Sequence, residues 1–566
     1  MDEPDCPVYL APGIKMEPLL MGWYAWPHLM SPVQHSLNIV FRHIPLIESF
    51  IQNPRIHLAA TRDPRMFGGP FLGVAEADIP RVKLLLDETK SQCSELIKFC
   101  RDFREFYSEI LTDAKGYSLE KYYDRLPEAI RGAAELAYNI NNQPVIYVIE
   151  ELLRNGPLDL SRLEEICLSR TAEADRAFFM NTPRIRRETE ITIKTNFNDR
   201  KLDALAKLRT SPGYVGDIVE EIGLSEYPKE TLSLYFTVVK PRHRDASYDL
   251  GGVRVRYFGH ACVLLQSREI SILLDPMFSY EIGEGDAEKF TFYDLPDVID
   301  YVVITHGHQD HFCPEMLIQI RHRVKKVVIP GNHRGSISDP SLKLMLHRLG
   351  YHDVTTLSPF EAAGFPSGEI LSLPFPGEHA DLDIHSKQSL RISISGTAFL
   401  FLVDSNAIDP HLYTRLAPHI GPVDALFIGM ECSGAPLSWL YGPLLTQTVI
   451  RRDDESRRLN GSNSERAAKV VNAIDCKRVF IYAMGHETWM KFLMGMDFDP
   501  NSYQVAESDK LITYCEEMGI PAERLHGYRE LIVQPNASKS GGGVGFSEQS
   551  ADRDVVNGES AHDSGQ

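Results

Sequence analysis

Apolar side chains recur at helical spacing through much of the first 245 residues. The pattern is clearest over residues 89–111 and again over residues 128–153, where apolar positions three and four apart share one face. Such spacing predicts amphipathic helices that pack on a core. An apolar run over residues 232–239 predicts a strand. The charged, proline-containing residues 240–245 then mark a domain boundary.

From Gly251 the pattern changes to short apolar runs that alternate with amphipathic segments. We predict strands at Val253–Gln266, Ile270–Leu274, Tyr301–Ile304, Lys326–Ile329, Leu390–Ser395, Ala398–Val403, Ala425–Ile428 and Val479–Tyr482. We predict helices at Pro314–Arg321, Ser341–Leu349, Ser464–Ile474 and Ala506–Met518. This alternation predicts an α/β fold in which helices cover the outer faces of sheets.

The chain therefore divides into three parts. Residues 1–245 form a mixed, largely helical N-terminal domain, and residues 251–536 form an α/β domain. Residues 537–566 are rich in glycine and serine and almost without apolar side chains, so we expect them to be disordered. At 566 residues with 43% apolar side chains, the chain is long enough for two or more cores.

Charge and cysteine content narrow the function classes. A formal net charge of −19 disfavours a nucleic acid partner, because phosphate backbones are bound by clustered lysine and arginine. The first residues are acidic where a signal peptide is basic, and no apolar run approaches the ~20 residues that span a bilayer. The nine cysteines include no C-x-x-C pair. We therefore expect reduced thiols in a cytoplasmic protein that does not contact a membrane.

Candidate chemistry is concentrated in Thr305-His306-Gly307-His308-Gln309-Asp310-His311, directly after an apolar run. His306 and His308 are two residues apart, so in an extended segment their rings point to the same side and can bind one ion. Asp310 and His311 diverge and can reach a second ion, at the roughly 3.5–4 Å separation of two-metal centres. A histidine-rich surface turn is the alternative. The position between a buried strand and a helix favours the two-metal site.

Further ligands are expected where other apolar strands end. Asp404 follows the strand at 398–403 and is placed to bridge two ions. His486 follows the strand at 479–482 and supplies a fourth imidazole. Asp275 ends the strand at 270–274, and we expect it to orient a ligand rather than to bind metal.

Taken in this order, Asp275, the H-x-H-x-D-H loop, Asp404 and His486 resemble the metallo-β-lactamase superfamily. The resemblance covers roughly residues 251–536 and implies an αββα sandwich. One position departs from the usual pattern of the superfamily.

At that position, hydrolases of the superfamily place a histidine just after a glycine. This chain has Gly377-Glu378-His379 there. Glu378 occupies the place of the ligand, and His379, offset by one residue, is the alternative. A ligand set richer in carboxylates favours iron over zinc.

This substitution, together with the large N-terminal domain, resembles the diiron β-hydroxylases of chloramphenicol biosynthesis and their relatives. That resemblance implies an oxygen-dependent monooxygenase with two iron ions, dioxygen as co-substrate and an external electron donor. Its substrate would be an aminoacyl thioester on the carrier domain of a nonribosomal peptide synthetase, hydroxylated at the β-carbon. An electron-transfer partner and a homodimer formed through the N-terminal half are also implied.

The resemblance also assigns the metal ligands, residue by residue. One iron would be held by His306, His308 and Glu378, and the other by Asp310, His311 and His486. Asp404 would bridge the two irons, so that Glu378 and Asp404 act in catalysis through the metals.

Other residues around the site carry weaker signals. Within the loop 429–441, Glu431 would bind the substrate amine or serve as a hydrogen-bonded loop residue. Trp439 and Tyr441 would contact the substrate or pack in the core. We expect His260 to be structural or to orient a ligand, rather than to bind metal, and Cys313 to lie in the core.

Two basic runs, residues 184–187 and 321–326, are candidate contacts for an acidic carrier domain or simply solvated faces. The mixed-charge run at 451–458 is predicted to be an exposed loop. The main alternative function is a dizinc hydrolase that attacks an ester, lactone, phosphodiester or lactam with a metal-bound hydroxide. Glu378 discriminates between the two functions. A docking protein with a vestigial metal site is a third hypothesis.

Overall fold

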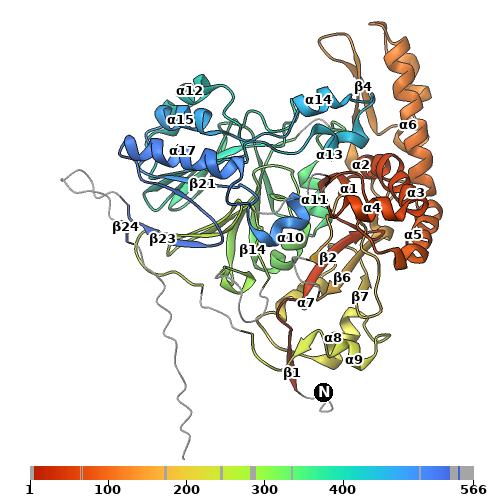
Figure 1. Ribbon diagram of the computed structural model, residues 1–566, viewed down its shortest axis with the longest axis horizontal. Coiled ribbons are helices and arrows are strands. Elements are labelled where there is room, and N and C mark those ends of the chain that lie inside the picture. The colour runs from red at the N-terminus through yellow and green to blue at the C-terminus, as the bar shows by residue number, and fades with distance from the viewer. Residues whose placement is uncertain are drawn as a thin grey trace, which may run out of the picture.

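The computed structural model describes residues 6–63, 66, 68–170, 175–241, 246–280, 289–332, 335–495, 499–535 and 546–547. Within these residues, the second half of the chain folds into two large sheets with helices on their outer faces, and the first half packs against one side (Figure 1). The α/β class and the αββα sandwich, preceded by a mixed and largely helical N-terminal part, are thereby confirmed.

The first large sheet has eight strands in the described part of the chain. In spatial order they are β15 (Val354–Leu357), β14 (Val324–Pro330), β13 (Ile299–Val303), β12 (Ser271–Leu274), β11 (Cys262–Gln266), β10 (Val253–Gly259), β23 (Arg529–Val533) and β24 (Phe546–Ser547). The four strands β12 to β15 run parallel, so their carboxyl ends meet at one edge.

The second large sheet has seven described strands. In spatial order they are β16 (Ala362–Phe365), β17 (Gly368–Leu373), β18 (Ser389–Ile394), β19 (Thr397–Val403), β20 (Ala425–Gly429), β21 (Val479–Tyr482) and β22 (Ala522–Arg524). The strands β19 to β22 are parallel. Each large sheet therefore presents a row of carboxyl ends, where loops can carry functional side chains.

The space between the two sheets is filled by apolar side chains. Phe427 stacks between Phe401 and Phe480, with ring centroids 4.6 and 4.8 Å apart. Val255 and Leu265, from the first sheet, belong to the same buried cluster. Because such interiors are close-packed, the loops at the carboxyl ends start from fixed positions.

Helices cover the outer faces of the sandwich. The second sheet carries α12 (Pro410–Ile420), α15 (Ser464–Ala473) and α17 (Tyr503–Glu517), which lie together on one side in Figure 1. The first sheet carries α10 (Pro314–Ile320) and α11 (Leu342–Arg348), which also contact the N-terminal half. The shorter helices α13 (Leu437–Tyr441), α14 (Arg451–Ser456) and α16 (Lys491–Met494) lie in the connecting loops.

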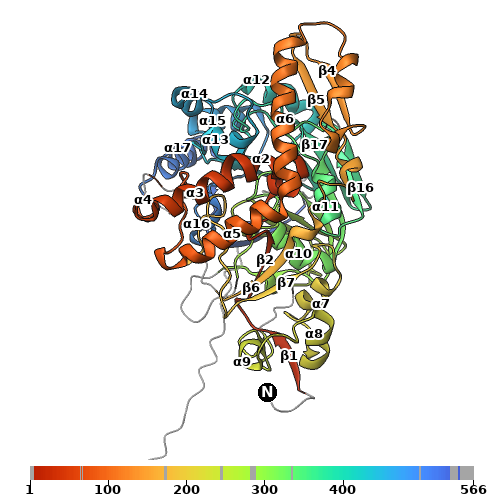
Figure 2. The ribbon, with the colours of Figure 1, turned by 90° about the vertical axis from the view of Figure 1, so that its right-hand side faces the viewer.

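The N-terminal half combines helices with small antiparallel sheets. Its helices are α1 (Pro27–Met30), α2 (Pro32–Asn38), α3 (Ile44–Gln52), α4 (Pro54–Ala60), α5 (Ile79–Gln92), α6 (Ser94–Asp113), α7 (Lys201–Lys207), α8 (Val215–Ile222) and α9 (Lys229–Leu232). Its strands are β1 (Pro7–Leu10), β2 (Lys15–Leu20), β3 (Trp23–Tyr24), β4 (Ala134–Tyr138), β5 (Pro144–Val148), β6 (Glu164–Ser169), β7 (Ile191–Lys194), β8 (Gly213–Tyr214) and β9 (Phe236–Thr237). Figure 2 shows α6 beside the β4–β5 hairpin, at the opposite end of this half from α8 and β1.

A buried charged cluster joins the two halves of the chain. Arg176 lies 3.0 Å from Glu17 on β2 and 2.6 Å from Glu315 on α10. The hydroxyls of Tyr24 and Tyr280 donate to Glu315 at 2.8 and 2.5 Å. Since α10 begins just after the loop at 305–311, this cluster fixes the helix that follows the candidate metal ligands.

Several predicted elements differ from the structure. The helix predicted at 128–153 is wrong, because Asn142 adopts a left-handed φ of 54° and turns the chain into the β4–β5 hairpin. The strand predicted at 232–239 is also wrong, since a helix ends there and only Phe236–Thr237 is extended. The helical region at 89–111 is interrupted at Cys93. The strand predicted at 253–266 is two antiparallel strands that turn at His260.

The charged runs also differ from expectation. Arg321 and Arg323 are buried, because Arg321 bonds Asp203 and the main chain of both halves, so these two arginines form neither a solvated face nor a docking surface, while Lys325 in the same run is exposed. The run at 451–458 contains the short helix α14 where a loop was predicted. The predicted disordered tail lies outside the described residues, apart from Phe546–Ser547, which pairs with β23.

The cysteines and helices of the described part fit the expectations from composition. All nine cysteines are free thiols, and Cys313 is buried as predicted. None of the helices in the described ranges combines the length and hydropathy that crossing a membrane requires.

Replacing Asn463 tests the N-terminal cap of α15, one of the helices that cover the second sheet. The Asn463 side chain accepts from the backbone N–H of Arg466 and caps α15. We expect Asn463→Ala to lower the free energy of unfolding by about 0.5–2 kcal/mol, measured by denaturant unfolding. Asn463→Asp, which keeps the acceptor, should stay close to the wild type; an equal loss in both variants would contradict the capping role.

Candidate metal centre

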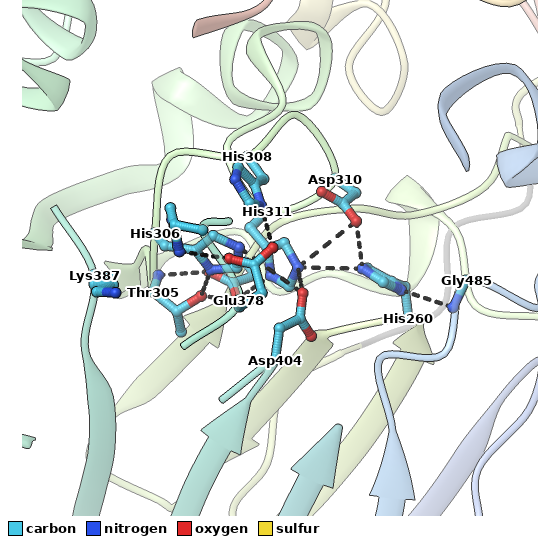
Figure 3. Close-up of polar contacts among 12 residues, drawn as sticks. His260, Thr305, His306, His308, Asp310, His311, Glu378, Lys387, Asp404 and Gly485 are labelled. Atoms are coloured by element: carbon cyan, nitrogen blue, oxygen red, sulfur yellow. Dashed lines mark hydrogen bonds and ion pairs between the residues drawn. The ribbon is translucent and has the colours of Figure 1, made fainter. Parts of the chain in front are cut away.

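Six of the seven predicted metal ligands gather in one buried place, where strands of both large sheets end (Figure 3). The loop at 305–311 leaves β13 of the first sheet. Asp404 directly follows β19, and Glu378 lies after β17, both in the second sheet. The packing of the two sheets therefore brings together side chains that lie far apart in the sequence.

His306, His308 and Glu378 form the first group of donors. Their ligand atoms lie within 4.8 Å of one another, and Glu378 Oε1 is 2.7 Å from His308 Nδ1. The two imidazole rings are neighbours, with centroids 4.7 Å apart. The spacing of two residues therefore places both rings on one side, as predicted.

Asp404 lies between this group and the rest of the loop. Its Oδ2 is 3.0 Å from His311 Nε2 and 3.8 Å from His306 Nε2. The same three residues form a second group of donors. Asp310 lies beyond, with Oδ2 3.8 Å from His311 Nε2. Asp404 thus occupies the position that a bridging carboxylate requires.

Two unsatisfied atoms indicate that the site is built for cations. Among the described residues, the buried His306 Nε2 and Asp404 Oδ1 have no hydrogen-bond partner. Leaving a buried polar atom unpaired costs about 1–3 kcal/mol, which a bound metal ion would offset. Imidazole nitrogens and carboxylate oxygens are ligands that iron accepts. The residues present therefore fit two metal ions.

The electrostatics of the pocket keep Glu378 and His306 in metal-binding forms. Burial raises the pKa of Glu378, but His308 and His379 outweigh burial and hold that pKa below its ordinary value. Burial lowers the pKa of the His306 imidazole well below its ordinary value, so this ring stays neutral with a free lone pair. Burial also lowers the pKa of His308 and His311, but the adjacent carboxylates outweigh burial and raise both pKa values, so a metal ion must displace a proton from these two rings. Ionised carboxylates and neutral imidazoles are the forms that bind metal.

The turn at 377–381 bears on whether Glu378 or His379 is the metal ligand. Glu378 has a left-handed φ of 68°, and a Cβ at Gly377 would lie 2.3 Å from the Asn406 side chain. Only glycine fits there, and the strained turn directs the Glu378 carboxylate into the donor group. His379 belongs to none of the donor groups and stacks on the His308 ring at 4.5 Å. The geometry supports Glu378 as the ligand.

Asp275 orients a ligand, as the sequence suggested. Its Oδ2 lies 2.8 Å from His311 Nδ1, and the N–H and hydroxyl of Thr305 donate to its two oxygens at 2.8 and 2.6 Å. Gln388, which the sequence did not point to, donates its backbone N–H to the Thr305 carbonyl at 2.9 Å. The loop that carries the histidines is therefore held from both sheets.

Removing the charge of Asp275 should weaken metal binding, although Asp275 is not itself a predicted metal ligand. We expect Asp275→Asn to weaken metal affinity by about 10- to 100-fold, because such outer carboxylates fix the ring they contact. Competition with a chelator measures this. Asp300→Asn is the matched control, since Asp300 accepts from Ser271 and Lys325 outside the donor groups. Unchanged affinity in the Asp275 variant would contradict the orienting role.

His486 is placed differently from the expected pattern, whereas His260 contacts two of the predicted ligands. His486 is buried after β21 but lies outside the donor groups, and the third group consists of His260, Asp310 and His311. His260 Nε2 instead lies 3.1 Å from Asp310 Oδ2 and 3.3 Å from His311 Nε2. The N–H of Gly485 donates to His260 Nδ1 at 3.2 Å, which leaves the proton of a neutral ring on Nε2, facing Asp310. His260 thus positions both Asp310 and the loop that carries His486.

A cavity of about 110 Å³ opens beside the donors. Glu431 and Trp439 line it, together with Phe178, which packs edge to face on Trp439 at 5.5 Å. Burial, with Asp404 and Asp310 nearby, raises the pKa of Glu431 well above its ordinary value. Tyr441 does not line the cavity, and its hydroxyl lies 3.3 Å from His308 Nε2. Of the three predicted substrate contacts, two therefore face the open space.

Comparisons with known proteins cover nearly the whole chain. A family model described as "Diiron non-heme beta-hydroxylase N-terminal domain" matches residues 9–240, and one described as "Beta-lactamase superfamily domain" matches residues 254–367. The chain is 35% identical over 528 residues, 92% of this chain and 99% of the relative, to the 4-amino-L-phenylalanyl-[CmlP-peptidyl-carrier-protein] 3-hydroxylase of Streptomyces venezuelae.

Solved structures agree with these sequence matches. The crystal structure of CmlA, a diiron β-hydroxylase from Streptomyces venezuelae, matches with a TM-score of 0.86 at 35% identity, covering 93% of this chain and 99% of CmlA. A structure of a CmlA mutant matches with a TM-score of 0.85 at 34% identity, covering 93% of this chain and 100% of the mutant. The likeness therefore extends over both the N-terminal half and the sandwich.

Proposed function

We propose, from the premise that this chain belongs to the diiron non-heme β-hydroxylase family, that it hydroxylates the β-carbon of an aminoacyl thioester held on a carrier domain of a nonribosomal peptide synthetase. The observation that carries the proposal is the buried donor set with Glu378 where hydrolases of the sandwich fold have a histidine. The relative in Streptomyces venezuelae is named for a substrate on a peptidyl carrier protein, which supports the same class of substrate here.

The proposed ligands are those that the family resemblance assigns. One iron would be held by His306, His308 and Glu378, the other by Asp310, His311 and His486, and Asp404 would bridge them. Two bound irons, reduced by an external donor, would supply the chemistry that puts one atom of dioxygen into a C–H bond and releases the other as water. His486 enters this set from the resemblance, and its burial beside the Gly485–His260 bond supports it.

The chain's own residues orient the substrate and exclude water. Glu431 is proposed to bind the amino group of the aminoacyl substrate from the wall of the cavity. Phe178 and Trp439 would hold the side chain of the substrate between them and the donors. Tyr441 lies outside the cavity, where its hydroxyl contacts the His308 ring and fixes the orientation of that ring. Water that entered this space would compete with the substrate for the same positions.

Three further parts of the proposal concern the enzyme's surroundings. Electrons come from a separate electron-transfer partner. The enzyme works in the cytoplasm, which nine free thiols support. It forms a homodimer through the N-terminal half, residues 1–245, while residues 251–536 carry the chemistry.

A dizinc hydrolase is the function that this proposal displaces. Metal-bound hydroxide on this sandwich would serve ester, lactone or phosphodiester cleavage. Glu378, the N-terminal family match and the 35% identity to a hydroxylase over 92% of the chain all favour the oxygenase. A vestigial metal site is equally disfavoured, because the described pocket retains its buried donors.

The test is turnover on a panel of peptidyl carrier domains, each loaded with a different amino acid, including 4-amino-L-phenylalanine. We expect one loaded carrier to gain a single oxygen atom from isotopically labelled dioxygen when a chemical reductant is supplied. Mass spectrometry of the released amino acid locates the oxygen at the β-carbon. Label that comes from water instead, or release of the amino acid without oxygen, would contradict the proposal.

A further inference from the structure

A second cavity lies next to the metal pocket on its N-terminal side. It measures about 250 Å³ and lies between the chain that follows α4 and residues 175–182. Phe178 lines both this cavity and the metal pocket. The two spaces are therefore neighbours that share a wall.

The shared wall is aromatic and thin. A Cβ at Gly68, on the side of the second cavity, would lie 1.8 Å from the Trp439 ring. A Cβ at Gly495, on the side of the metal pocket, would lie 3.1 Å from Phe178 and 3.3 Å from Trp439. Glycine backbones thus press on the Phe178–Trp439 pair from both cavities. The Phe178 and Trp439 rings are therefore all that separates the two spaces on this side.

The lining of the second cavity suits a slender chain that contains amides. Asn181 and Thr182 contribute a carboxamide and a hydroxyl, and Gly69 and Gly73 expose backbone groups. The Gly73 N–H donates to Thr182 Oγ1 at 2.9 Å, and the Asn181 carboxamide donates to the Gly69 carbonyl. The amide and hydroxyl oxygens retain further acceptor capacity. A phosphopantetheine arm, whose chain carries amides, finds matching partners here.

The same segment of chain continues from this cavity to a groove on the surface. Arg184, Ile185 and Arg186 line a groove of about 220 Å³ with Leu84 and Leu85. Leu84 is 58% exposed. The six steps of chain from Phe178 to Arg184 span at most about 20 Å, which a fully extended phosphopantetheine arm can match. The groove therefore lies within reach of the metal pocket.

We propose that residues 175–186 form the track along which a carrier domain presents its substrate. This inference rests on the proposed function. The carrier domain docks on the groove, its arm passes through the second cavity, and the aminoacyl thioester enters the metal pocket past Phe178 and Trp439.

The occupant is an acidic carrier domain because of the chemistry of the groove. The groove is lined by three arginines, Arg81, Arg184 and Arg186, against one carboxylate, Glu88, around an apolar floor of leucine and isoleucine, on a chain whose formal net charge is −19. Each arginine also pairs with a carboxylate of its surroundings, which holds the guanidinium at the rim. A local cationic rim on an acidic protein directs an acidic partner to this place.

The docking step is tested with Leu84→Asp. An added carboxylate in the apolar floor should weaken binding of the carrier by about tenfold or more, measured by titration with the loaded carrier that the wild type hydroxylates fastest in the panel. The matched control is Leu152→Asp, because Leu152 is 59% exposed and lies outside the groove. Equal binding by both variants and the wild type would overturn the docking site.

The path of the arm is tested with Ala177→Trp. Ala177 is exposed and lines the second cavity, so a large ring there should block the passage without disturbing the core. We expect hydroxylation of the loaded carrier to fall by at least tenfold, while carrier binding and iron content stay at wild-type levels and Ala177→Ser stays active. Full activity in the tryptophan variant would overturn the path.

These outcomes separate the inference from the function on which it rests. If the wild type neither binds nor hydroxylates any loaded carrier, the proposed function itself fails. If the wild type is active while the Leu84 and Ala177 variants match it, only the track is wrong, and the arm enters the metal pocket from its other rim near Ser433.

Discussion

Replacing Glu378 with alanine is expected to abolish hydroxylation and to remove one of the two irons. Loss of an outer carboxylate already costs about 10- to 100-fold, so loss of a direct ligand should lower turnover by more than roughly 100-fold. The Glu378 carboxylate lies 2.7 Å from His308 Nδ1 inside the donor group, and no other described carboxylate belongs to that group. Iron analysis should give roughly one iron per chain instead of two.

His379→Ala is the control that tests whether Glu378, rather than its neighbour, is the metal ligand. His379 is the adjacent residue and stacks on His308, but it belongs to none of the donor groups. We expect this variant to keep both irons and most of the activity. If iron is lost from the His379 variant and kept in the Glu378 variant, the assignment of the ligand is reversed.

Among the single substitutions proposed here, Arg176→Ala is expected to lower the free energy of unfolding the most. The Arg176 side chain is 3% exposed, and its loss would leave Glu315 buried without a cationic partner and Glu17 with Arg184 alone. Breaking a buried ion pair in this way costs about 3–5 kcal/mol. The cluster also joins β2 to α10, so its loss should expose the interface between the two halves. Denaturant unfolding followed by tryptophan fluorescence measures the change.

Two comparisons decide whether charge pairing is the cause. The triple variant Arg176→Met, Glu17→Gln and Glu315→Gln removes all three charges together and should recover much of the lost stability. The pair of Lys90 and Glu48 is about half exposed, and Lys90→Ala should cost under about 1 kcal/mol. An Arg176→Ala loss as small as that of Lys90→Ala would contradict the role of the cluster.

Parts of the fold followed directly from the hydrophobic pattern. The runs at 301–304, 398–403 and 425–428 are buried central strands because parallel strands covered on both faces are apolar throughout. The hairpin at 134–148 was not recognised, since its alternate apolar positions also fit helical spacing. The deciding signal was local: Asn141-Asn142 before Gln143-Pro144 favours a turn.

The metal site was predictable where spacing within one loop sets geometry. His306, His308, Asp310 and His311 lie within six consecutive residues, so their arrangement depends on little else. His260 was predicted to be structural or to orient a ligand, and its contact with Asp310 arises from a turn with φ of 50° between two strands where a single strand was predicted. Residues such as Gln388 and Phe178 reach the site through tertiary packing, which the pattern along the chain does not encode.

The most direct test of the diiron centre is metal analysis of protein purified without added metal, combined with its optical spectrum before and after reduction under argon. We expect roughly two irons per chain, with a ligand-to-iron absorption band that bleaches on reduction. Two zinc ions and a featureless spectrum, persisting after expression in iron-supplemented medium, would contradict the diiron assignment and return the chain to the hydrolases.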